Sequence, residues 1–115
     1  METGANKRNR KMKETNIQNL ILLESGKHGI ILFRNQVGAY KLADGRFLRS
    51  GLCVGSSDLI GLMPNGRFLA VEVKKVGGMV SPEQVNFLKM VNKKGGLGVS
   101  CYSVEDFLKK VVNNT

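Results

Sequence analysis

Residues 57–74 read SDLIGLMPNGRFLAVEVK, and this stretch decides the fold of the chain. Two runs rich in apolar residues, 57–62 and 67–74, flank the segment PNG at 64–66. Proline and glycine in such a short segment are typical of a tight turn between two paired strands. The stretch is therefore predicted to form a β-hairpin.

The length of the turn sets which residues face each other across this hairpin. A three-residue turn with Gly66 in the left-handed conformation places Met63 opposite Arg67. Counting back along both strands then places Asp58 opposite Glu72. A two-residue turn would shift the register by one residue and separate this pair.

The two faces of the hairpin differ in one respect only. Side chains two positions apart share a face of a strand, so the three-residue register projects Asp58, Glu72 and Lys74 from the same face. Both faces are otherwise apolar, which places the hairpin in the middle of a sheet covered on both sides. The acidic face also carries Ile60, Leu62, Phe68 and Ala70, and the opposite face carries Leu59, Leu69, Val71 and Val73.

The sequence on either side of the hairpin predicts helices and further strands. Ile17 and Ile21 recur at helical spacing, and Ser81-Pro82 followed by Gln84 is typical of a helix start. We expect an α/β fold of the α+β type with the order αββββαβα, in which helices flank a central mixed sheet. The predicted elements are a helix over 13–24, strands over 30–34, 37–42, 57–62 and 67–74, a helix from 81 to a stop at 95–96, a strand over 97–102 and a helix from 103.

Length and charge restrict the classes of protein to consider. A chain of 115 residues suffices for one core, so we expect a basic flexible arm at 1–12 and a single domain at 13–115. The net charge of +9 indicates a polyanionic partner such as nucleic acid. No apolar run approaches the ~20 residues of a membrane-spanning helix, and the N-terminus does not resemble a secretion signal, so a cytoplasmic location is expected. A single histidine argues against a Cys/His zinc site.

Asp58, Glu72 and Lys74 form the constellation that suggests chemistry. Two carboxylates opposed across a hairpin, with Cβ atoms roughly 5 Å apart, repel each other unless a cation lies between them. Mg²⁺ prefers oxygen ligands and can activate water for attack on a phosphodiester. Lys74 can position that water or stabilise charge in the transition state. The alternative is an ordinary ion pair between Glu72 and Lys74, because Glu-x-Lys occurs by chance in many strands.

At these residues the sequence resembles a known nuclease family. Ser57-Asp58 and Glu72-Val73-Lys74 are similar to the PD-(D/E)XK signature, and the wider pattern resembles its VRR-NUC branch in the stand-alone form of phages and bacteria. Ser57 stands where the signature has proline, a residue that shapes the backbone and supplies no ligand. The likeness also includes Glu14, NQVG at 35–38, GSSDLI at 55–60 and SPEQ at 81–84.

The resemblance implies a restriction-endonuclease-like core and a metal-dependent DNA endonuclease. The implied cofactor is Mg²⁺ or Mn²⁺. The implied substrate is branched or structured duplex DNA, such as a four-way junction or a flap, cut by a homodimer in a bacterial or phage-infected cell, with no small-molecule substrate and no membrane. Carried over by position, the metal ligands are Asp58, Glu72, the carbonyl of Val73 and, through water, Glu14, and the catalytic residues are Lys74, Asp58, Glu72 and Gln84.

Simpler alternatives exist for two of these residues and for the function itself. Glu14 could be a helix-start acid favoured by the helix dipole. Gln84 could serve only the capping box of its helix. A non-catalytic nucleic-acid-binding protein would use the same fold and charge without turnover, and an RNA-processing endonuclease would use the same chemistry.

Basic residues outside the constellation are candidates for contact with phosphates, although some charges face solvent in any protein of this composition. The predicted DNA-binding residues are Lys7, Arg8, Arg10, Lys11, Lys13, Arg34 and Lys75.

The region 38–53 contains apolar residues that the core does not need, and these could provide the contact between the two copies of a homodimer.

Overall fold

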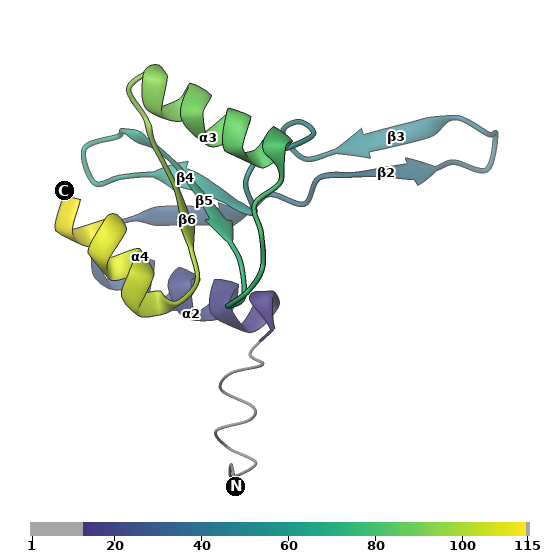
Figure 1. Ribbon diagram of the computed structural model, residues 1–115. Helices are drawn as coiled ribbons and strands as arrows, with labels where there is room; N and C mark the ends of the chain where they lie inside the picture. Colours follow the sequence, from purple (N-terminus) through teal and green to yellow (C-terminus); the bar gives the residue numbers. More distant parts are fainter. Residues whose placement is uncertain (1–12, 115) are drawn as a thin grey trace, which may run out of the picture.

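A computed structural model describes residues 13–114 of the chain (Figure 1). The basic N-terminal segment expected at 1–12 lies outside these residues. In chain order the elements are α2 (Glu14–Lys27), β1 (Ile31–Arg34), β2 (Gly38–Lys41), β3 (Phe47–Ser50), β4 (Leu59–Leu62), β5 (Phe68–Val73), α3 (Pro82–Lys93), β6 (Leu97–Cys101), α4 (Val104–Lys110) and a short 3-10 helix η1 (Val112–Asn114).

The central sheet is mixed and has the strand order β1-β4-β5-β6. β4 pairs antiparallel with β1 and with β5, whereas β6 runs parallel to β5. A parallel pair needs a crossover connection, and α3 provides it between β5 and β6. The hairpin of β4 and β5 therefore occupies the middle of the sheet, as the sequence predicts.

The hairpin of β4 and β5 also has the predicted three-residue register. Gly66 in the turn has a φ of 86°, a left-handed conformation that glycine adopts without strain. Leu59 of β4 pairs with Val71 of β5. One further step along both strands places Asp58 opposite Glu72, so this part of the sequence analysis is confirmed.

Helices cover both faces of the sheet, with α2 and α4 on one face and α3 on the other (Figure 1). Burial of apolar side chains on both faces is the main term that stabilises the fold. No helix among the described residues is long and apolar enough to cross a membrane. The larger core, under α2 and α4, includes Ile17, Ile21, Leu59, Leu69, Val71, Val73, Phe107 and Val111, and the smaller cluster under α3 consists of Ala70, Phe87 and Val91.

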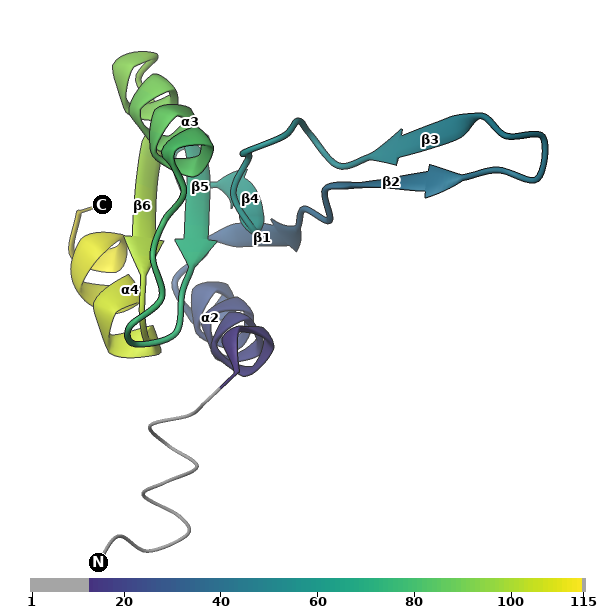
Figure 2. The same cartoon turned by 45° about the vertical axis from the view of Figure 1, so that its right-hand side comes forward.

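The structure corrects the predicted element order between β1 and β4. The sequence predicts one strand over 37–42, whereas the structure has two strands, β2 and β3, that pair antiparallel as a separate sheet. We call residues 38–50 the arm, because this hairpin projects from the body of the molecule (Figures 1 and 2). Phe47 and Leu48 of β3 are 67% and 56% exposed, so β3 has no alternation of buried and exposed side chains that would reveal it. The observed order is αβββββαβα.

Candidate active site

Asp58 lies directly before β4 and is fixed by backbone groups from two neighbouring segments. Its Oδ2 accepts a hydrogen bond from the Val73 N–H over 2.9 Å. Its carbonyl accepts a hydrogen bond from the Asn35 N–H over 2.8 Å, which extends the pairing of β1 with β4. The Asp58 carboxylate is therefore held beside the end of β5.

Ser57 occupies the position where the PD-(D/E)XK signature has proline, and hydrogen bonds hold the backbone there. The side chain is fully buried, and its Oγ donates to the Leu59 carbonyl over 2.9 Å. Asn35 Nδ2 donates to the Ser57 carbonyl over 2.9 Å. These bonds restrain the chain before Asp58, where a proline ring would otherwise restrict φ.

Glu72 is buried in β5 with one carboxylate oxygen left without a partner. The residue is 1% exposed. Gln84 Nε2 donates to Glu72 Oε1 over 2.9 Å, and Lys74 Nζ lies 3.9 Å from the same oxygen. Glu72 Oε2 is buried and has no hydrogen-bond partner among residues 13–114. Such an oxygen is costly to bury alone, so a proton or a cation is expected beside it.

The environment of Glu72 favours its protonated form when no cation is bound. Burial, and then the neighbouring Asp58 carboxyl group, raise the pKa of Glu72 from 4.5 to about 8, while the charge of Lys74 acts in the opposite direction. At neutral pH the Asp58 and Glu72 pair therefore retains a proton. A divalent cation bound by both carboxylates would displace that proton.

Lys74 follows β5 and is neither fully exposed nor fully buried. Its side chain is 17% exposed, and its backbone N–H donates to the Cys101 carbonyl over 3.0 Å, which fixes the chain against β6. The 3.9 Å separation from a buried Glu72 oxygen is unlike an ordinary ion pair at the surface, where both side chains are solvated. The side chain of Val73 packs in the larger core, so this residue can reach the site through its backbone only.

Gln84 caps α3 and also contacts the Glu72 carboxylate. Ser81 Oγ accepts a hydrogen bond from the Gln84 N–H over 3.2 Å, and Gln84 Oε1 accepts one from the Ser81 N–H over 2.8 Å, which makes a capping box at the start of α3. Since the cap uses Oε1, the Nε2 of the same amide is directed to Glu72. The cap thereby orients the amide that contacts the carboxylate.

Glu14 begins α2 and binds the backbone after β5. Its Oε2 accepts a hydrogen bond from the Lys75 N–H over 3.2 Å. The part of the chain that the structure describes contains no group of three or more His, Cys, Asp or Glu side chains suited to hold a metal ion. In this arrangement Glu14 ties the start of α2 to the segment that follows Lys74.

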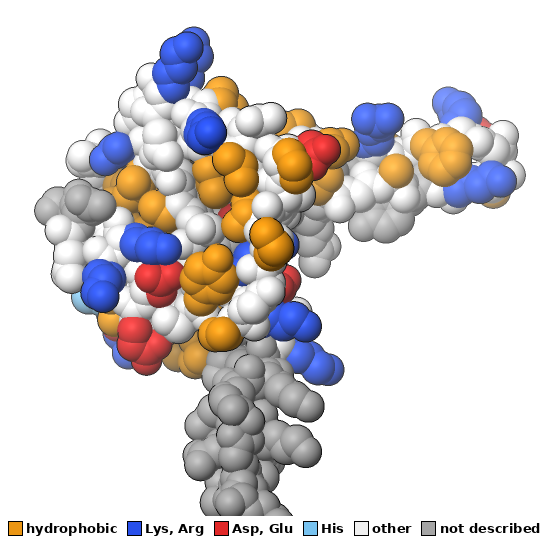
Figure 3. Space-filling model, in the orientation of Figure 1, with side chains coloured by type: hydrophobic (Ala, Val, Ile, Leu, Met, Phe, Trp, Pro, Cys, Tyr) orange, Lys and Arg blue, Asp and Glu red, His pale blue; other side chains and the backbone are white. Residues whose placement is uncertain are grey.

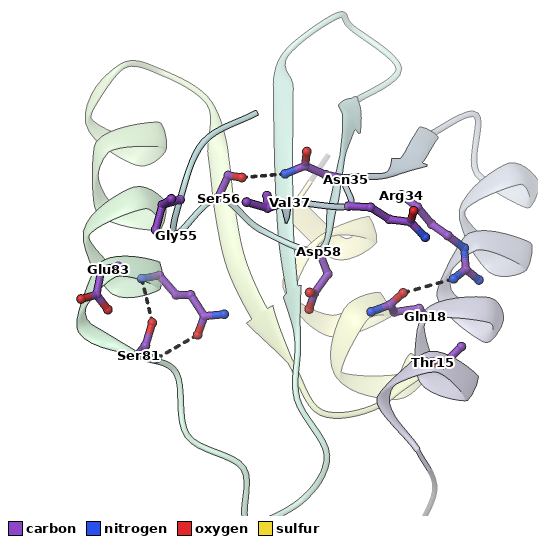
Figure 4. A pocket seen from close by; sticks show the side chains of 13 residues that line it. Thr15, Gln18, Arg34, Asn35, Val37, Gly55, Ser56, Asp58, Ser81 and Glu83 are labelled. Atoms are coloured by element: carbon purple, nitrogen blue, oxygen red, sulfur yellow. Dashed lines mark hydrogen bonds between the residues drawn. The ribbon is translucent and has the colours of Figure 1, made fainter. Parts of the chain in front are cut away.

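A cavity of about 620 Å³ opens beside Asp58, between α2 and the N-terminal end of α3 (Figure 4). In Figure 4 the Asp58 side chain points into the space between Gln18 of α2 and Ser81, the N-cap residue before α3. Arg34 lines the same cavity, and its guanidinium group donates to the side chains of Gln18 and Asn19. The lining is mostly polar and carries one cation, Arg34, and two carboxylates, Asp58 and Glu83.

Three of the predicted DNA-binding residues are described by the structure. Arg34 is exposed at the cavity, and Lys13 and Lys75 are exposed close to Glu14, at the start of α2 and after β5. The other predicted residues, Lys7, Arg8, Arg10 and Lys11, lie outside the described residues.

Asn35 lies in the NQVG segment of the family resemblance, and no sequence signal assigns it a role. It is buried where β1, the arm and the Asp58 segment meet. Its Nδ2 donates to Ser56 Oγ over 2.7 Å and to the Ser57 carbonyl, and its Oδ1 accepts from the Leu52 N–H over 2.9 Å. These partners lie 21, 22 and 17 residues away in the sequence, so no local pattern predicts the network.

The donor atoms of the site fit a hard divalent cation. Asp58 and Glu72 offer carboxylate oxygens, the ligands that Mg²⁺ and Mn²⁺ prefer, and the Val73 carbonyl is the backbone oxygen that follows directly on Glu72. The unpartnered Glu72 Oε2 is a further reason to expect a cation, because coordination would satisfy it.

Comparison with known families matches residues 12–105 to the VRR-NUC domain. No curated protein matches the chain. The matched range contains the central sheet, α2 and α3, and with them Asp58, Glu72 and Lys74. The chain therefore belongs to the VRR-NUC family of nucleases.

Proposed function

We propose that the chain is a divalent-cation-dependent DNA endonuclease that hydrolyses phosphodiester bonds with Asp58, Glu72 and Lys74. The observation that carries the proposal is the pair of opposed carboxylates, in which Glu72 Oε2 is buried without a partner and a lysine ammonium group lies 3.9 Å from Oε1. Without a cation, only a proton can satisfy this oxygen, whereas a cation bound by both carboxylates would satisfy it with both ionised. Membership of a nuclease family supports the same reading.

Asp58 and Glu72 would hold Mg²⁺ or Mn²⁺, together with the Val73 carbonyl. When bound, the ion supplies Lewis-acid stabilisation of negative charge on the phosphate and promotes the ionisation of water. The chain prepares this site in two ways: the Val73 N–H orients Asp58, and the Gln84 amide orients Glu72.

Lys74 would take part in the reaction, and the cavity would bind the substrate. The Lys74 ammonium group would hold the attacking water or stabilise the charge that develops on the phosphoryl oxygens. The cavity beside Asp58 would admit the scissile phosphate, with Arg34 at its wall. Glu14 would contribute indirectly, because it restrains the backbone that follows Lys74.

The proposal extends to branched DNA as the preferred substrate and to a homodimer as the active unit. The net charge of +9 supports a nucleic-acid substrate. Two-fold symmetric junctions match the symmetry of an isologous dimer, which would place two such sites on one substrate.

Cleavage assays test this proposal directly. The protein is incubated with Mg²⁺ or Mn²⁺ and with linear, flap and four-way-junction DNA, alongside RNA of matched structure. We expect cuts in branched DNA that EDTA abolishes, and we expect the Asp58→Asn variant to be inactive. Cleavage that persists in excess EDTA, or in Asp58→Asn, would exclude the proposed mechanism. Binding without cleavage would favour the non-catalytic alternative.

A further inference from the structure

The arm is a two-stranded ribbon that extends from the rim of the cavity. In Figures 1 and 2 it projects away from the central sheet and its helices. Asn35 fixes its root, because Asn35 Oδ1 accepts a hydrogen bond from the Leu52 N–H while Asn35 Nδ2 binds the segment before Asp58. A hairpin with so little packing is marginally stable alone, so it is expected to gain contacts from a ligand or partner.

The strand register separates the arm into two faces of different character. Lys41 pairs with Phe47, and Ala39 pairs with Arg49, so these four side chains lie on one face. We call Lys41, Phe47 and Arg49 the cationic face of the arm. The opposite face includes the apolar residue Leu48.

The charges on the cationic face are available for a partner. Neither Lys41 nor Arg49 forms an ion pair with a carboxylate among residues 13–114, whereas Arg46 is paired with Asp44 over 2.7 Å. Phe47 is a neighbour of both cations, opposite Lys41 and two positions before Arg49, and is 67% exposed. Figure 3 shows Lys and Arg side chains gathered with a large hydrophobic side chain on the projecting arm.

A second hollow lies between this face and the candidate active site. Ala39 and Arg49 line a second hollow of about 430 Å³ at the root of the arm. Val37 and Val54 line both this hollow and the cavity that contains Asp58. The two hollows therefore adjoin at Val37 and Val54, so a ligand seated at Asp58 lies next to the root of the arm.

We propose that the cationic face of the arm binds DNA next to the phosphate that is cut, with Lys41 and Arg49 on the backbone and Phe47 toward the bases. This inference rests on the proposed nuclease function. A two-stranded ribbon has the width of the major groove of DNA, and two unpaired cations complement phosphates. A second copy of the chain is a poorer occupant of this face, because an isologous contact would bring like charges together.

The test measures DNA binding without cleavage, in Ca²⁺ and in the Lys74→Ala background. The double variant Lys41→Gln/Arg49→Gln is compared with Lys93→Gln/Lys109→Gln, which removes the same charge from α3 and α4 on the far side of the body from the arm (Figure 1). We expect the arm variant to bind a four-way junction roughly tenfold more weakly and to lower the slope of log affinity against log salt by about two. The control should change both quantities by less than half as much.

The outcomes separate this inference from the function on which it rests. Equal binding by the arm variant and the control would overturn the inference even if the wild-type protein cuts DNA. Sedimentation of the arm variant as a smaller species than wild type, with an unchanged salt slope, would also overturn it and would assign this face to a second copy. Wild-type protein that binds no DNA would remove the proposed function and the inference together.

Discussion

Gln84 Nε2 donates a hydrogen bond to Glu72 Oε1 over 2.9 Å, and the same Gln84 side chain closes the capping box of α3 through its Oε1. One side chain therefore links the start of α3 by hydrogen bonds to Glu72, the carboxylate that carries the proposed chemistry. A shift of the cap would move the Gln84 amide donor away from Glu72, and the position of the Glu72 carboxylate would be less restrained.

Substitution of Gln84 by Glu should separate these two roles. Glutamate is also suited to the third position of a capping box, so the Gln84→Glu variant should retain most of its stability. It would, however, place a carboxylate where Glu72 now receives a donor, which should weaken cation binding and reduce cleavage by at least tenfold. Cleavage rates and Mn²⁺ affinity measure the effect.

Ser81→Ala is the matched control for Gln84→Glu. It removes the cap acceptor and should lower the free energy of unfolding by about 1 kcal/mol, while the contact between Gln84 and Glu72 survives. We expect its cleavage to stay within a few-fold of wild type. Equal loss of cleavage in both variants would mean that Gln84 acts through the cap alone.

Lys74→Ala should abolish cleavage and leave DNA affinity within a small factor. The ammonium group is one charge among many that can contact phosphates, but it is the one beside Glu72. Single-turnover cleavage and binding in Ca²⁺ measure the two quantities separately. Near wild-type cleavage by this variant would show that Glu-x-Lys is an ordinary structural pair.

The sequence predicts the part of the fold that depends on the hairpin of β4 and β5. The PNG turn specifies a three-residue register, and apolar residues on both faces require cover on both sides. Together these features suffice to place Asp58 opposite Glu72 in the centre of the sheet. The capping signal SPEQ likewise predicts where α3 begins, at Pro82.

The arm and the role of Asn35 could not be predicted because neither leaves a local pattern. The side chains of β3 that the structure describes are exposed, so its sequence lacks the alternation that identifies a strand with one buried face. Asn35 acts through partners that meet it only in the folded chain. The family pattern assigns Glu14 to the site, yet its hydrogen bond to the Lys75 N–H is a tertiary contact that spacing along the chain does not reveal.

Asn35→Ala should impair both stability and catalysis. The substitution removes the amide donor to the Ser57 carbonyl and the acceptor of the Leu52 N–H, whereas the Ser56 hydroxyl keeps its bonds to Cys53, at a cost of roughly 2–3 kcal/mol in the free energy of unfolding. It also frees the segment before Asp58, so cleavage should fall at temperatures where the variant is still folded. Urea unfolding and cleavage at low temperature distinguish the two effects. Full cleavage by folded Asn35→Ala would show that this network does not position Asp58.

The raised pKa of Glu72 should make the stability of the metal-free protein depend on pH. The pKa of Glu72 is about 8 in the folded protein and 4.5 for an ordinary glutamate, so between these values the folded state holds a proton that the unfolded chain has released. The free energy of unfolding should therefore fall as the pH rises through this window. The stability that depends on the Glu72 proton is fully present only below pH 4.5.

Urea unfolding in EDTA across this pH window, compared for wild type and Glu72→Gln, tests the origin of the effect. Glutamine is neutral at every pH, so the variant should lose most of the decline between 4.5 and about 8. Saturating Ca²⁺ should raise the unfolding midpoint of wild type, and should do so most at the alkaline end, because the cation competes with the proton for the same carboxylates. A decline of equal size in Glu72→Gln, or a Ca²⁺ effect that is unchanged by the substitution, would show that Glu72 is not the group that binds the proton and the cation.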